Sequence, residues 1–217
     1  MASTTIILKH YCRGSTLMDK ELKAAEDMYN DYIQKIPSKK HPGCVTLEDV
    51  LERCFTGNHF SYLHLTKAQR EKLVKDAVGS LVKANVLSFS GGDFEDLYDK
   101  VKGAIGALPG VGHLVLYDTT KMIGHILSPK VLPEKYVYTQ SGAKDGAKTL
   151  LGVSRMGMRV PTSLLQPYFP DVSSIYIEDI LCIYKKWFVK GGVNTKRGKL
   201  PYCPPPLPPT PTNPSCC

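Results

Sequence analysis

The residues Leu-Pro-Gly-Val-Gly at positions 108–112 have the types and spacing that let a peptide backbone approach an anion closely. Pro109 fixes its own φ, and Gly110 and Gly112 tolerate positive φ, so the segment predicts a tight turn. An apolar helical pattern begins directly after the turn. The free N–H groups and the dipole of a helix N-terminus attract phosphate. A side chain on either glycine would block that approach. The alternative is an ordinary connection between two helices, in which the glycines only relieve crowding.

Helical periodicity surrounds this turn. Apolar residues three or four apart predict a helix that leads into it, and a second helix follows to Leu127. Further helices are predicted over 15–36, 46–55, 66–87, 141–152 and 173–188, with cap candidates Thr46, Thr66, Ser141 and Ser173 or Ser174. Only residues 3–11 and 135–140 look extended. The sequence therefore predicts a mainly α fold with few or no strands.

The order helix, Leu-Pro-Gly-Val-Gly, helix resembles the helix-hairpin-helix motif of DNA-binding proteins, especially the DNA-glycosylase superfamily. The resemblance extends over roughly residues 45–188 and is strongest over 94–127. It implies a DNA-glycosylase-like helical bundle in which the N–H groups of Gly110, Gly112 and His113 hold a phosphate of duplex DNA. It also implies a monovalent cation beside the hairpin, and contacts to the DNA backbone rather than to base edges.

The same resemblance implies two catalytic groups that this chain lacks. Bifunctional glycosylases have a lysine where this sequence has Leu114, and the catalytic aspartate aligns with Ser141. Leu114 cannot form a Schiff base, and Ser141 cannot stabilise a cationic sugar. The cysteines also lack the count and spacing of an iron–sulfur loop. We therefore expect a DNA-binding protein without catalysis. The enzymatic alternative is a glycosylase or lyase whose acid has relocated to Glu134 or Asp145.

The net charge of +8 is concentrated late in the chain. Residues 141–199 contain 10 basic and 4 acidic residues, a net of +6. Within this region Ser141, Lys144, Lys148 and Arg155 are predicted DNA contacts, with Tyr138 and Gln140 in the same polar patch. The alternative is a charged face that only keeps the protein in solution.

The cysteines and the hydropathy of the chain indicate where the protein is located and whether it binds metal or membrane. Seven cysteines without a regular spacing indicate reduced thiols and an intracellular location, in the cytoplasm, nucleoid or nucleus. The series Cys44, Cys54, His59 and His64 lacks the close ligand pairs of a zinc site, so no metal is expected. No apolar run reaches the roughly 18 residues of a membrane span, so no membrane association is expected.

Composition divides the chain into three parts. Residues 1–45 are predicted to form an N-terminal helical segment, 46–188 the helix-hairpin-helix core, and 189–217 a disordered, basic, proline-rich tail. Residues 204–211 (PPPLPPTP) resemble ligands of proline-recognition domains. A third hypothesis is therefore an adaptor that acts through its tail, with a purely structural hairpin.

Overall fold

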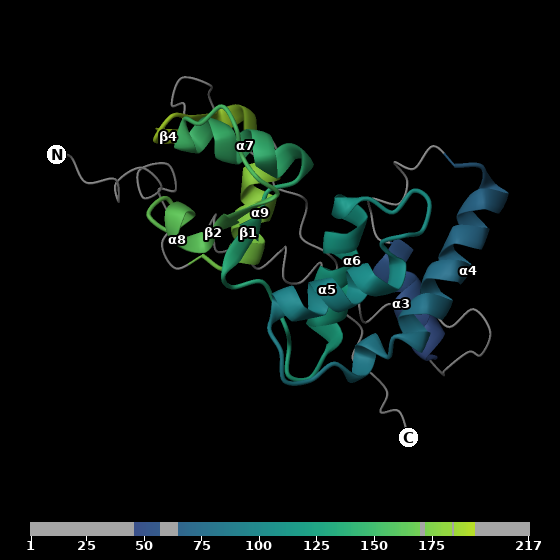
Figure 1. Cartoon of the computed structure of the whole chain (residues 1–217). Coiled ribbons are helices and arrows are strands. Elements are labelled where there is room, and N and C mark those ends of the chain that lie inside the picture. The colour runs from purple at the N-terminus through teal and green to yellow at the C-terminus, as the bar shows by residue number, and fades with distance from the viewer. Residues whose placement is uncertain (1–45, 57–64, 170–171, 184, 194–217) are drawn as a thin grey trace, which may run out of the picture.

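The fold is mainly helical, as the sequence predicts. The computed structural model describes residues 46–56, 65–169, 172–183 and 185–193 (Figure 1). Within them lie α3 (Leu47–Thr56), α4 (Lys67–Lys83), α5 (Phe94–Ile105), α6 (His113–Ile126), α7 (Ser141–Leu151), α8 (Thr162–Leu165) and α9 (Ser174–Ile183). Two 3₁₀ turns, η2 (Val86–Ser88) and η3 (Lys185–Trp187), accompany them. The predicted N-terminal helical segment 1–45 and the proline tract 204–211 lie outside the described residues.

The first lobe consists of α3, α4, η2, α5 and α6, on the right of Figure 1. In it α3 packs on α4 and α6, and α5 packs on α4 and α6. Local hydrogen bonds fix where three of these helices begin. The Thr46 hydroxyl accepts from Asp49 N, and Thr66 and Asp93 form reciprocal capping boxes with Gln69 and Asp96. The apolar stripes of the four helices meet in one core.

The second lobe contains α7, α8, α9 and four short strands in two antiparallel pairs, with a separate core. β1 (Tyr136–Tyr138) pairs with β2 (Arg159–Pro161), and β3 (Phe188–Val189) pairs with β4 (Gly192–Val193). α7 packs closely on α9. The two backbones are so near at Gly146 that a Cβ there would collide with the carbonyl oxygen of Leu181. This contact requires glycine at that position.

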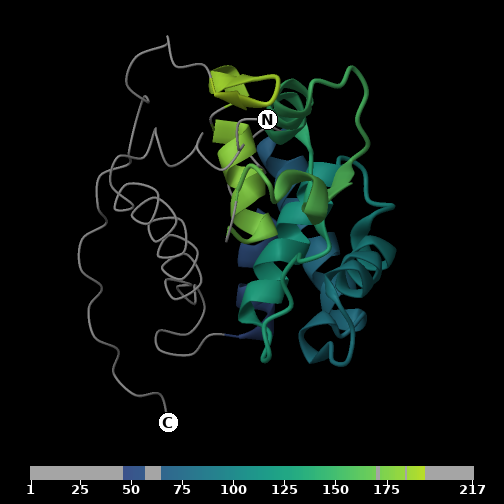
Figure 2. The ribbon, with the colours of Figure 1, turned by 90° about the vertical axis from the view of Figure 1, so that its left-hand side faces the viewer.

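A single segment, residues 127–135, connects the lobes and is tied to both. The Ser174 hydroxyl donates to Pro133 O, and the Thr162 hydroxyl donates to Glu134 O at 2.8 Å. On the other side, Val131 N donates to Gly124 O in α6 at 3.0 Å. Figure 2 looks onto the second lobe, from the left-hand side of Figure 1.

The structure departs from the sequence expectations at several boundaries. β2, β3 and β4 are absent from the sequence predictions, because each has only two or three residues and so gives no periodic pattern. β2 also depends on β1, about 20 residues earlier in the chain. Ser141 is the first residue of α7 rather than its cap, which is Gln140. Ordered structure continues to Val193, beyond the predicted start of the tail at 189, because Val189 pairs with Gly192.

Candidate nucleic-acid interface

The hairpin that joins α5 to α6 is a tight turn with a defined hydrogen bond. Val111 N donates to Leu108 O at 3.1 Å, which places Pro109 and Gly110 at the two central positions. Gly110 has a φ of 88°. This is the arrangement of a type II β-turn, which favours proline first and needs positive φ at the second position. The predicted tight turn is therefore confirmed, and the turn itself explains the glycine at position 110.

Gly112 differs from the expectation. It is the N-cap of α6 with φ −99° and ψ 178°, an extended conformation that any residue adopts, so its backbone does not need glycine. A Cβ at Gly112 would also have no atom within 4 Å. No side chain caps α6, although side chains cap α3, α4 and α5. Gly112 and His113 are exposed, so the first turn of α6 presents its backbone to solvent.

The carbonyl oxygens of the hairpin decide how a cation would fit. Those of Ile105, Leu108 and Gly112 already accept backbone hydrogen bonds from Leu108, Val111 and Leu116. A carbonyl oxygen has two lone pairs, so these oxygens and those of residues 109–111 are the groups that would hold the monovalent cation that the resemblance implies.

The predicted contacts on α7 share one helix. Ser141, Lys144 and Lys148 follow one another at helical spacing; Ser141 is exposed and the two lysines are half-buried. Ser141 has a φ of 46°, an uncommon conformation for a residue with a side chain. Asp145 is exposed, as is Arg155 in the loop after α7.

The structure does not assemble all predicted residues into one patch. Gly110, Gly112 and His113 belong to the first lobe, whereas Ser141, Lys144 and Lys148 belong to α7, which packs on α9 and η3 (Figure 1). Glu134 lies exposed on the connecting segment.

Tyr138 and Gln140 are buried, so their assignment to a surface patch is wrong. The ring of Tyr138 stacks on Tyr117 with centroids 4.7 Å apart and meets the edge of Phe94 at 5.4 Å. These three rings form an aromatic cluster between α5, α6 and β1. Packing the three rings together gains more free energy than exposing the Tyr138 hydroxyl to water would. β1 has only three residues, so its sequence does not show which side chains face the interior.

A comparison with protein-family models, with curated proteins and with solved structures finds nothing similar. Among the described residues, no helix is long and apolar enough to cross a membrane. No group of three or more His, Cys, Asp or Glu residues in that part of the chain could hold a metal ion.

A charged cluster that the sequence reasoning missed lies between α6 and α9. Lys121 is only 4% exposed, and its Nζ lies 3.5 Å from Glu178 Oε2 and 3.5 Å from Asp179 Oδ1. The same nitrogen lies 5.3 Å from the centroid of the Tyr117 ring. We call Lys121, Glu178 and Asp179 the interlobe cluster. A signal for it exists in the sequence: α6 is buried on nearly all sides, so a lysine in its middle must find a partner.

Burial changes the protonation of this region. Loss of solvent around Glu178, with Asp179 and Asp118 nearby, raises its pKa to about 8, although Lys121 opposes the shift. One ammonium lies against two adjacent carboxylates, so Lys121 only partly offsets the cost of burying the charge of Glu178. His125 is buried as well, and burial lowers its pKa to about 4.

Proposed function

We propose that this chain binds the phosphate backbone of duplex DNA through the hairpin between α5 and α6. The observation that carries the proposal is Gly112. The fold requires glycine at Gly110 to make the turn, but neither backbone conformation nor crowding requires it at Gly112. A glycine there leaves the first N–H groups of α6 open to an anion.

Further support comes from charge. The chain has a net charge of +8, and the basic excess follows the hairpin in sequence. Lys144 and Lys148 on α7 and Arg155 after it supply cationic side chains of the kind that contact phosphates. Such contacts are independent of base sequence, so we expect binding without strong sequence preference.

The test is fluorescence anisotropy with a labelled duplex over a series of salt concentrations. A few phosphate contacts predict a slope of log affinity against log salt of about −3 to −5. No binding at low salt, or affinity that does not change with salt, would contradict the proposal.

Gly112→Ser locates the site. Serine is compatible with the extended backbone and is a good N-cap, so the variant should fold with stability equal to or a few tenths of a kcal/mol above the parent. Its hydroxyl would accept the N–H that a phosphate would otherwise take, so DNA affinity should fall. Gly79→Ser is the matched control, because Gly79 is exposed on α4 and a Cβ there also meets nothing within 4 Å. If both variants bind like the parent, the hairpin is not the DNA site.

A further inference from the structure

A pocket lies at the N-terminus of α5, at the opposite end of that helix from the hairpin. Its volume is about 280 Å³. The loop Phe89–Asp93 forms one side, and residues 129–135 of the connecting segment form the other. Ligand sites often lie where two parts of a fold meet, and this segment joins the two lobes.

The loop that forms the first wall depends on two glycines. Gly91 has a φ of 77°, which side chains rarely allow. A Cβ at Gly92 would lie 2.6 Å from Cζ of the Phe89 ring. Substituting either Gly91 or Gly92 would therefore change the conformation of the loop Phe89–Asp93 that lines the pocket.

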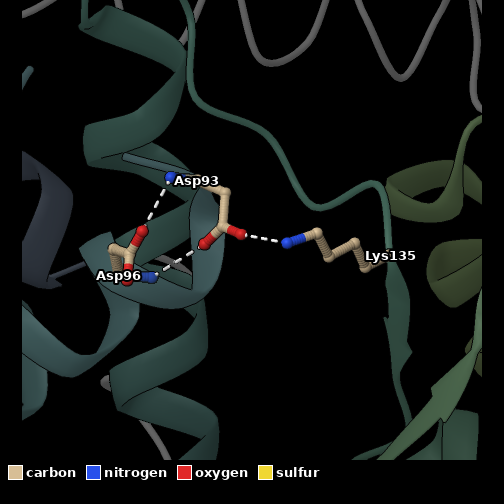
Figure 3. A network of polar contacts seen from close by, with 3 residues as sticks. All are labelled: Asp93, Asp96 and Lys135. Atoms are coloured by element: carbon tan, nitrogen blue, oxygen red, sulfur yellow. Dashed lines mark hydrogen bonds and ion pairs between the residues drawn. The ribbon is translucent and has the colours of Figure 1, made fainter. Parts of the chain in front are cut away.

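Asp93 and Lys135 hold the two walls together and satisfy each other. One oxygen of Asp93 accepts from Asp96 N at 3.1 Å, and the other accepts from Lys135 Nζ (Figure 3). The backbone N–H of Asp93 in turn donates to Asp96 Oδ2 at 3.0 Å. Neither charge of the Asp93–Lys135 pair is left for a ligand.

Glu95 is a carboxylate of the pocket that takes no part in the Asp93–Lys135 contact. It lines the pocket, is half-buried, and has one carboxylate oxygen, Oε1, fully enclosed with no hydrogen-bond donor among the described residues. Its burial, reinforced by the charge of Asp93, raises its pKa. A carboxylate in this setting gains from a donor that arrives with a ligand.

The charges disfavour an anionic ligand despite the glycine-rich loop. Asp93, Glu95 and Asp96 stand at the start of α5, where their carboxylates repel a phosphate. The lining has three carboxylates, those of Asp93, Glu95 and Glu134, against the two ammonium groups of Lys130 and Lys135. Pro129, Val131 and Leu132 add an apolar side to the pocket. A ligand with a cationic head and a short hydrocarbon part matches both surfaces.

We propose that this pocket binds a small organic amine, whose ammonium group donates to the Glu95 carboxylate while its hydrocarbon part lies against Val131 and Leu132. The site is separate from the hairpin, so it does not depend on DNA binding.

The experiment is a titration of the full chain with n-butylamine, followed by the amide resonances of Gly91 and Gly92. Ionic strength and pH are held constant, and 1-butanol is the uncharged probe. We expect saturable shifts at both glycines with the amine and none with the alcohol. Absence of saturation, or equal shifts with the alcohol, would overturn the proposal.

Two variants assign the binding to Glu95. Glu95→Gln keeps the shape and removes the charge, and should weaken amine binding about tenfold or more. Asp99→Asn is the matched control, since Asp99 is exposed on the same helix outside the pocket. Equal affinity of Glu95→Gln and the parent would refute the role of Glu95. If Glu95→Gln does not fold, the comparison of amine with alcohol on the parent protein still decides.

Discussion

Lys121 is the charged residue with the most demanding environment in the described part of the chain. Its ammonium lies between two carboxylates of α9 and is shielded from water. Burying ions costs free energy that pairing repays only in part, so such clusters favour one specific packing rather than high stability. The interlobe cluster thus fixes how α9 is oriented on α6.

Glu178 should make stability depend on pH. Its pKa rises from about 4.5 to about 8 on folding, so the folded protein holds a proton that the unfolded chain releases in this interval. The free energy of unfolding therefore falls as the pH rises toward 8. His125 has the opposite effect below pH 6.5, because its pKa falls to about 4 on folding. We expect the thermal midpoint to decrease between pH 6.5 and 8.

Melting curves of Glu178→Gln check this expectation. The amide cannot titrate, so the decrease between pH 6.5 and 8 should become clearly smaller. Glu134→Gln, at an exposed position, should keep the dependence of the parent. An unchanged slope in Glu178→Gln would show that another group titrates.

Lys121→Met should destabilise the protein strongly. Removing the ammonium takes the counter-charge from the half-buried Asp179 and the polar partner from the buried Glu178, at a cost of about 3–5 kcal/mol in urea unfolding. The double variant Lys121→Met/Glu178→Leu should recover much of this loss, because an apolar pair then fills the contact. Lys83→Met, on the last turn of α4, is the control. A loss below about 1 kcal/mol for Lys121→Met would mean that the cluster is hydrated.

Among the helices and turns, the α5–α6 hairpin separates two glycines that look equivalent in the sequence. Gly110 serves the turn, whereas Gly112 serves the open start of α6. Their substitutions should therefore affect different properties.

Gly110→Ala should lower stability by about 1 kcal/mol, because alanine is strained at a φ of 88°. Gly112→Ala should cost less, since its backbone is already in an extended conformation. Urea unfolding of both variants measures the difference. An equal or reversed order would indicate that the turn is not of type II in solution.

At the scale of the whole molecule, the two lobes carry different parts of the predicted DNA site. The first carries the hairpin and the second carries the α7 lysines, so DNA that contacts both must span the junction. The second lobe is closed by the strand pair β3–β4, which packs Phe188 on Phe169 with centroids 6.3 Å apart.

Truncation should locate the end of the folded unit. A chain ending at Val193 should melt like the full chain, because the composition of 194–217 cannot form a core. A chain ending at residue 187 loses Phe188 and the hydrogen bond from Gly191 N to Leu150 O at 2.7 Å. Its midpoint should fall by about 5–10 °C. Equal midpoints for all three chains would show that the β3–β4 pair contributes nothing.

We expect the protein to leave damaged or mismatched bases in place even where it binds duplex DNA. Leu114 and Ser141 occupy the positions where the resemblance requires a lysine and an aspartate. Single-turnover assays on a lesion panel, with alkali to reveal abasic sites, measure excision. Product that disappears in Glu134→Gln or Asp145→Asn would instead establish an enzyme with a relocated acid.

Local interactions made much of the helical fold predictable. Thr46 and Thr66 cap their helices through residues three positions away, and the Pro109–Gly110 pair encodes its own turn. Gly152 ends α7 in the left-handed conformation, which glycine adopts readily. Each of these signals is complete within a few neighbouring residues, so sequence alone suffices.

Other features of the fold depend on contacts between residues that are far apart in the sequence. The burial of Tyr138 depends on rings from α5 and α6, and the pairing of Lys121 depends on carboxylates from α9. The strand β2 likewise depends on its pairing with β1, which lies about 20 residues earlier in the chain. No local pattern specifies such contacts, because their free energy comes from partners that are distant in the chain and come together only in the folded core.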